Sequence, residues 1–110
     1  MLLVIPDVKL KSTKIVEYII KETLRKKIPL VGYNSWFAKN GAILSFIINK
    51  RDIGIQTGEI AKNMLEGNEP INLQIQPPAK VSISINLKTA KKLGVEISQT
   101  IISQADEVID

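Results

Sequence analysis

The chain has 110 residues, of which 45% are hydrophobic and 24% are charged, and its formal net charge is +4. This length predicts one domain that buries roughly 60–70% of the surface its unfolded chain exposes, and the composition argues against a disordered tail. The sequence contains no cysteine and no histidine, which excludes disulfides, thiolate metal sites and the usual general base. We therefore expect no cofactor, no bound metal and no enzymatic activity.

The positive charge does not predict nucleic-acid binding. Arg25, Lys26 and Lys27 lie where a helix is expected to end, and cations there complement the helix dipole. The chain has only two arginines and no aromatic residues between its basic ones. No apolar run reaches the roughly 18 residues of a membrane span. Residues 1–5 are apolar but lack a basic flank and a cleavage site, which favours a strand over a signal peptide.

The change between continuous apolar runs and apolar residues at helical spacing predicts the helices and strands of the first half of the chain. Continuous apolar runs predict buried strands at residues 2–6, 29–33 and 42–48. Apolar residues at helical spacing predict an amphipathic helix over 12–27, with Ser12 or Thr13 as its cap and Pro29 beyond its end. A helix between two buried strands implies a parallel crossover.

The second half begins with a predicted helix over 52–66, with Asp52 as N-cap and Gly67 as its stop. Gly54 and Gly58 share one face of this helix, and tight packing on a sheet is their expected explanation. Residues 67–78 are expected to form a surface connection, and 80–86 a half-exposed strand at a sheet edge or between lobes. A short helix over 89–93 ended by Gly94 and a final amphipathic helix over 98–108 complete the prediction. The fold class is α/β, with a mostly parallel sheet flanked by helices.

Polar side chains follow three predicted strands. Asp7 follows the first strand, Asn34, Ser35 and Trp36 follow the second, and Asn49 follows the third. The carboxyl ends of parallel strands share one edge of a sheet, so these five residues are the predicted ligand site. A carboxylate, amide and hydroxyl groups and an aromatic wall suit an amino-acid zwitterion.

Each candidate also has a structural explanation. Asp7 after Pro6 is equally suited to capping a turn or the following helix. Asn34 and Ser35 suit the N-cap of a short helix over 36–40, and Trp36 with Phe37 could seal an apolar edge or a partner interface. These roles can coexist with ligand binding.

Several segments together resemble one family. The resemblance covers nearly all of the chain and rests on seven segments: Met1-Leu-Leu-Val-Ile-Pro-Asp, Lys27-Ile-Pro-Leu-Val-Gly-Tyr-Asn-Ser, Lys39-Asn-Gly-Ala-Ile-Leu, Asp52-Ile-Gly-Ile-Gln-Thr-Gly-Glu-Ile-Ala, Met64-Leu-Glu-Gly-Asn-Glu-Pro, Ile85-Asn-Leu-Lys-Thr-Ala-Lys-Lys-Leu-Gly-Val and Gln104-Ala-Asp-Glu-Val-Ile. In this order they resemble the C-terminal portion of ABC-transporter solute-binding proteins with the type I periplasmic-binding fold, in the branch that binds aromatic amino acids.

The resemblance implies a solute-binding component of an ABC import system, with a permease partner and a periplasmic or cell-surface location. It implies that residues 1–110 form one α/β domain equivalent to the C-terminal lobe, with 1–49 as the ligand-lobe segment and 50–110 as the lobe-crossing and C-terminal segment. The first lobe would then be missing, so we expect weak ligand binding and a homo-oligomer joined through the helix at 53–65 or the strand at 81–85. The alternative is a receiver-like regulatory or interaction domain with Asp7 as phosphoacceptor, but no acidic pair follows a strand to hold its Mg²⁺.

Overall fold

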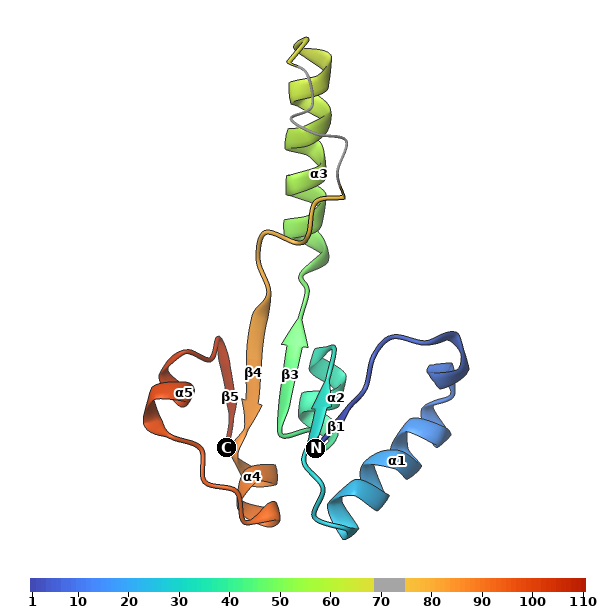
Figure 1. Cartoon of the computed structure of the whole chain (residues 1–110), viewed down its shortest axis with the longest axis vertical. Helices are drawn as coiled ribbons and strands as arrows, with labels where there is room; N and C mark the ends of the chain where they lie inside the picture. The colour runs from blue at the N-terminus through green and yellow to red at the C-terminus, as the bar shows by residue number, and fades with distance from the viewer. Residues whose placement is uncertain (69–74) are drawn as a thin grey trace. The chain divides into compact units, whose positions relative to one another are not determined.

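The computed structural model describes residues 1–68 and 75–110. They form two compact units, and each unit is described here by itself. Unit 1 consists of Met1–Ile47 and Ser82–Asp110, and unit 2 consists of Ile48–Val81. Figure 1 shows the strands of unit 1 side by side in one sheet, with helices against it.

The sheet of unit 1 has five strands in the order β1-β2-β3-β4-β5. The first three strands run parallel, β3 and β4 pair antiparallel, and β4 and β5 pair parallel. This mostly parallel sheet confirms the predicted α/β class. The bounds are β1 Leu2–Leu3, β2 Leu30–Gly32, β3 Leu44–Ile47, β4 Ser82–Asn86 and β5 Glu107–Ile109.

The first crossover runs from β1 through two helices to β2. After η1, a 3₁₀ helix at Val8–Lys11, the amphipathic helix α1 spans Thr13–Arg25. Ser12 occupies the N-cap position, but its side chain makes no capping hydrogen bond. At the other end Arg25 lies in the last turn and donates a 2.7 Å hydrogen bond to Glu22, which lowers the pKa of that carboxyl.

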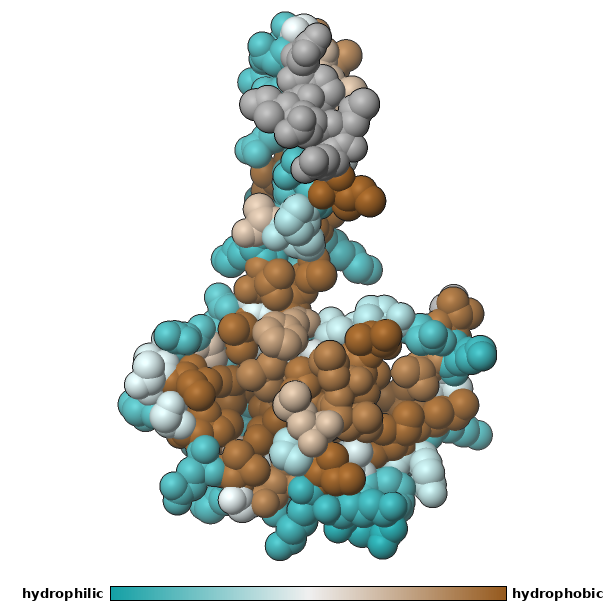
Figure 2. Space-filling view, viewed as in Figure 1, coloured by the Kyte–Doolittle hydropathy of each residue, from teal (hydrophilic) through white to brown (hydrophobic). Residues whose placement is uncertain are grey.

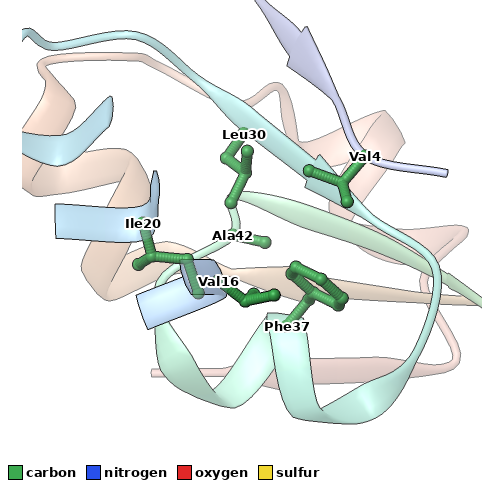
Figure 3. Close-up of a cluster of buried hydrophobic side chains, with 6 residues drawn as sticks. All are labelled: Val4, Val16, Ile20, Leu30, Phe37 and Ala42. Carbon is green, nitrogen blue, oxygen red and sulfur yellow. The ribbon is translucent and has the colours of Figure 1, made fainter. Parts of the chain in front are cut away.

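The main core lies between this helix and the sheet. It contains buried side chains from several elements, two of them from α1, and Figure 3 shows them converging from the end of β1, α1, β2 and α2 (Ser35–Asn40). Leu30 is 1% exposed and Phe37 is 2% exposed, and full burial of such a side chain contributes about 1.5–3 kcal/mol. The members are Val4, Val16, Ile20, Leu30, Phe37 and Ala42.

The C-terminal segment differs from its prediction in two places. Strand β4 was expected to be half-exposed, at a sheet edge or between lobes, but it pairs with β3 on one side and β5 on the other, and Ser84 and Ile85 are fully buried. The predicted helix over 98–108 is also wrong. Only Gln99–Ser103 form a helix, α5, and residues 107–109 form β5. The Asp106 carboxylate accepts a 2.8 Å hydrogen bond from Ile83 N, and this pairing holds the chain extended beside β4.

The short helix before this segment agrees with the prediction. Helix α4, Leu87–Leu93, begins at its cap Asn86 and ends at Gly94, whose φ of 71° is left-handed. Ala90 and Leu93 from α4 form a second small core cluster with Ile43.

Helix α3, Lys50–Leu65, begins earlier than predicted. Its N-cap is Asn49, whose Oδ1 accepts a 2.9 Å hydrogen bond from Arg51 N, so the assignment of Asp52 as N-cap is wrong. No residue of α3 is buried. Among residues 1–68 and 75–110, no atom outside the helix's own backbone and the adjacent residues lies within 4 Å of a Cβ added at Gly54 or Gly58, so the predicted tight packing on a sheet at these glycines is wrong too.

The connection expected over 67–78 falls partly outside the described residues. In the described part, two hydrogen bonds attach the end of this connection to α3: Gln56 Nε2 donates to Pro77 O at 3.0 Å, and Gln56 Oε1 accepts from Ala79 N at 3.0 Å. No helix within residues 1–68 and 75–110 is long and apolar enough to cross a membrane.

Candidate functional site

A hollow of about 260 Å³ lies at the carboxyl end of β2, and we call it the β2 hollow. Its lining comes from η1, α1, the residues after β2 and α2, which are all parts of unit 1. The carboxyl end of a parallel strand is where α/β proteins place ligands, so the position agrees with the sequence-based expectation. The lining residues are Leu10, Thr13, Val16, Tyr33, Asn34, Trp36 and Phe37.

Asn34 shapes one side of the β2 hollow. Its backbone is extended, and its Oδ1 accepts a 3.2 Å hydrogen bond from Phe37 N, which starts α2 directly after the strand. Asn40 Nδ2 donates to Trp36 O at 2.7 Å and closes the other end of this short helix. The predicted capping role of Asn34 is therefore confirmed, and the cap fixes where Trp36 and Phe37 lie.

Three aromatic rings form a connected wall. The ring centroids of Tyr33 and Phe37 are 5.0 Å apart, and those of Trp36 and Phe37 are 5.5 Å apart at an interplanar angle of 90°. These are favourable aromatic geometries. Phe37 belongs to the core, whereas Trp36 is 36% exposed and offers accessible surface beside the β2 hollow. The two residues of this pair therefore differ in role: Phe37 packs in the core, and Trp36 is accessible for contact with a ligand or a partner.

The approach of α2 to the sheet depends on Gly32. A Cβ at this position would overlap the Cβ of Phe37 and lie 2.9 Å from Ser45 Oγ. Glycine therefore lets the aromatic wall sit directly over the end of β2.

The lining offers neutral polar groups beside its apolar surface. Thr13 and Tyr33 carry hydroxyls and Asn34 an amide, and no lining residue is charged. Such a surface suits a flat apolar ring with a neutral hydrogen-bonding group. It does not by itself balance the charges of a zwitterion.

The structure also locates the remaining predicted site residues. Asp7 is exposed and caps η1, accepting a 2.7 Å hydrogen bond from Lys9 N, so it positions the 3₁₀ helix that supplies Leu10 to the lining. Ser35 is exposed at the first position of α2. Asn49 belongs to unit 2, where it caps α3.

Of the five predicted residues, Asn34 and Trp36 line the β2 hollow. The other lining residues were not predicted, because apolar residues such as Leu10 and Val16 resemble ordinary core positions. Tyr33 carried the best available signal, since an aromatic residue at a strand's carboxyl end directly before Asn34 faces the expected site edge.

Acidic residues do not gather into a metal site in the described part of the chain. Within residues 1–68 and 75–110 no group of three or more Asp, Glu, His or Cys side chains could hold a metal ion. A receiver-like domain needs such a group around its phosphoacceptor. Nothing in the described residues therefore favours the receiver-like alternative for Asp7.

Comparisons with known proteins agree with this fold. A family model described as ABC transporter substrate binding protein matches residues 3–109. An uncharacterized protein of Rickettsia prowazekii (strain Madrid E) is 27% identical over 75 residues, which cover 68% of this chain and 25% of that protein.

Two solved structures are similar as well. A conserved domain protein from Vibrio cholerae O1 biovar El Tor superposes with a TM-score of 0.62 at 28% identity, over 86% of this chain and 32% of its own. The ABC domain from Streptococcus pneumoniae, solved in complex with L-Trp, gives a TM-score of 0.55 at 24% identity, over 83% of this chain and 32% of its own. The chain thus spans a quarter to a third of the length of these relatives. Since the family model matches nearly every residue, the chain belongs to the ABC transporter substrate binding protein family.

Proposed function

We propose that this chain forms one wall of the solute site of an ABC import system, and that the β2 hollow receives an apolar ring of the solute. The observation that best supports this proposal is the aromatic wall around an open hollow at the carboxyl end of β2, which consists of Tyr33, Trp36 and Phe37. In this proposal the complete protein delivers its solute to a permease from the periplasm or cell surface.

The size of the β2 hollow supports binding of part of a ligand. Sites for whole ligands usually measure about 300–1,000 Å³, and the hollow measures about 260 Å³. An aromatic amino acid has a ring of suitable shape, and the similar domain from Streptococcus pneumoniae was solved in complex with L-Trp. We propose an aromatic amino acid or a related ring compound as the solute.

The charged groups of such a solute need partners outside the lining. We propose that the exposed Asp7 carboxylate meets the ammonium group and that Ser35 and Asn34 donate to the carboxylate. Asn49, which caps α3, stays a prediction from the sequence alone. Because the chain spans about a third of its solved relatives, most of the solute surface stays hydrated. We expect a dissociation constant on the order of 1 mM for the chain alone.

Titration calorimetry with L-Trp, L-Phe and L-Ala tests the proposal. We expect heat from the two aromatic amino acids and none from L-Ala. Trp36→Ala should weaken binding about fivefold, because an aromatic contact is worth about 1 kcal/mol. Tyr18→Ala removes an exposed aromatic side chain of α1 that does not line the β2 hollow, and it should change nothing.

Asp7 requires a variant that separates its two roles. Asp7→Asn keeps a side-chain oxygen to accept from Lys9 N but removes the charge. If the carboxylate meets an ammonium group, Asp7→Asn weakens binding at an unchanged melting temperature. Equal binding of L-Ala and L-Phe by the wild-type chain, or full binding by Trp36→Ala, would show that the β2 hollow is not the ring site.

A further inference from the structure

Lysine side chains gather at one edge of unit 1, and we call this group the basic edge. The edge contains the amino ends of β2 and β3 and the carboxyl end of β4, so it lies at the opposite end of the sheet from the β2 hollow. Figure 1 shows the end of α1 and helix α4 at this edge, and Figure 2 shows hydrophilic surface there. The six lysines belong to the ends of α1 and α2 and to α4, and all are exposed: Lys26, Lys27, Lys39, Lys88, Lys91 and Lys92.

Packing brings the three helices together at this edge. Leu24 in the last turn of α1 packs against the second core cluster, which includes Ala90 and Leu93 of α4. A Cβ built on Gly41, directly after α2, would lie 3.2 Å from Leu24 Cδ1, so α2 also ends beside the last turn of α1. The six lysines are therefore neighbours in space although they come from three separate segments of the sequence.

The helix dipole explains only some of these lysines. Lys39, Lys91 and Lys92 lie in the last turns of their helices, where a positive charge is favourable. Lys88 lies in the first turn of α4, where the dipole disfavours a positive charge. Lys88 is therefore not explained by the stability of its helix.

Lys27 is not explained by local stability either. Its backbone is left-handed, with a φ of 54°, and glycine adopts this conformation more easily than any residue with a Cβ. Helices α2, α3 and α4 are each followed by a glycine with positive φ. The end of α1 thus carries a lysine at a position where the backbone favours glycine.

The charge of the basic edge is only partly offset. Of the described acidic residues near it, Glu22 accepts a 2.7 Å hydrogen bond from Arg25, while Glu96 and Asp110 follow α4 and β5. Within residues 1–68 and 75–110, none of the six lysines forms an ion pair. The edge therefore presents a net positive surface to solvent.

We propose that the basic edge docks on the anionic headgroups of a lipid surface. Clusters of about 4–8 basic residues bind anionic lipids through charge, and lysine is a compact charge that meets phosphates without a fixed geometry. Nucleic acids and protein partners are recognised more through aromatic and arginine side chains. The six residues include no aromatic side chain, and the neighbouring Arg25 is engaged by Glu22 through two hydrogen bonds. Docking through this edge leaves the β2 hollow accessible at the other end of the sheet.

Co-sedimentation of the whole chain with lipid vesicles tests the proposal. We expect binding to vesicles of equal parts phosphatidylcholine and phosphatidylglycerol, no binding to phosphatidylcholine alone, and loss of binding in about 0.5 M salt. Each lysine near an anionic surface strengthens binding about fivefold, so the double variant Lys27→Gln and Lys88→Gln should weaken it roughly 25-fold. The double variant Lys9→Gln and Lys14→Gln is the matched control, because it removes the same charge from exposed positions near the opposite end of the sheet. It should weaken binding by less than about twofold.

Lys27→Gly separates lipid binding from stability. Glycine suits the left-handed backbone, so the melting temperature should rise, while loss of the charge should weaken vesicle binding about fivefold. Absence of binding to the anionic vesicles, or equal weakening by the two double variants, would overturn the proposal. Tighter binding of a mixed-sequence DNA duplex than of the vesicles at the same ionic strength would also overturn it and assign the edge to nucleic acid. None of these measurements involves the β2 hollow, so their outcome is independent of solute binding.

Discussion

At the scale of single residues, Asn86 joins the two chain segments of unit 1. Its Nδ2 donates to Ala38 O at 2.7 Å, and its Oδ1 accepts from Thr89 N at 2.9 Å. The side chain is only 5% exposed, so water does not replace these bonds when they are lost. One residue thus caps α4 and fixes α2, whose N-terminal end forms the β2 hollow.

Asn86→Ala should lower the free energy of unfolding by about 2–4 kcal/mol, because it leaves two buried backbone groups without partners. Asn34→Ala removes a half-buried cap and should lower it by only about 1 kcal/mol. Urea unfolding followed by far-UV circular dichroism measures both. Equal losses would show that the link from Asn86 to Ala38 adds nothing beyond helix capping.

Ser45 and Ser84 form a matched pair on neighbouring strands. They pair across β3 and β4, and both are fully buried. Ser84 Oγ donates to Glu107 at 2.8 Å, whereas Ser45 Oγ has no hydrogen-bond partner among the described residues. Ser84→Ala should cost about 1 kcal/mol of unfolding free energy, and Ser45→Ala should be neutral or stabilising. A loss in Ser45→Ala as large as that in Ser84→Ala, measured by thermal unfolding, would contradict this difference.

The sequence predicted part of the lining of the β2 hollow. Asn34 and Trp36 were predicted because polar and aromatic residues after a buried strand have a recognisable pattern. Leu10 and Val16 could not be predicted as lining, since an apolar residue beside a hollow and one inside a core look alike in sequence. The difference arises only from how η1 and α1 pack against α2.

At the scale of elements, α3 differs from the other long helix, α1, in how many of its residues are buried. Helix α1 buries Val16, Ile20 and Thr23, whereas α3 buries no residue along its length. Packing normally supplies most helix stability in proteins, so intrinsic propensity matters more for α3. Within the described residues, its two interior glycines therefore have no packing contact that would explain their cost to the helix.

Gly54→Ala and Gly58→Ala should each stabilise α3 by about 1 kcal/mol, because neither new methyl group would meet an atom of another described segment within 4 Å. Hydrogen exchange of the α3 amides should slow by about fivefold for each change. Gly32→Ala is the opposite case and should destabilise unit 1 by about 1–3 kcal/mol or more, because its Cβ overlaps Phe37. Slower unfolding in Gly32→Ala, or faster exchange in Gly54→Ala, would contradict the described environments.

Element prediction succeeded where the local pattern and the tertiary structure agree. The strands β1 to β3 and helix α1 follow from continuous apolar runs and a helical period. The helix predicted over 98–108 is wrong although its apolar residues have helical spacing (Ile101, Ile102, Ala105 and Val108). Asp106 and Glu107 instead form hydrogen bonds with β4, and the chain there is extended. Such pairing connects residues 23 positions apart, so no local window contains it.

At the scale of the whole molecule, the chain spans a quarter to a third of the length of its relatives and has two compact units. The fold class and the family were accessible from sequence, since the predicted resemblance agrees with the match over residues 3–109. The division into a ligand-lobe segment at 1–49 and a lobe-crossing segment at 50–110 stays a prediction. In the structure, residues 82–110 belong to the same compact unit and the same sheet as residues 1–47. This pairing connects distant parts of the chain, so the sequence pattern does not reveal it.

The central claim, that the β2 hollow receives the ring of a solute, is tested most directly by the fluorescence of Trp36. This residue is the only tryptophan of the chain, and it lines the β2 hollow, so its emission reports that site alone. Titration with L-Phe, which does not emit where tryptophan does, should give a saturable change with the same dissociation constant as calorimetry, and L-Ala should give none. Binding heat from L-Phe with unchanged Trp36 emission would contradict the account, because the amino acid would then bind elsewhere.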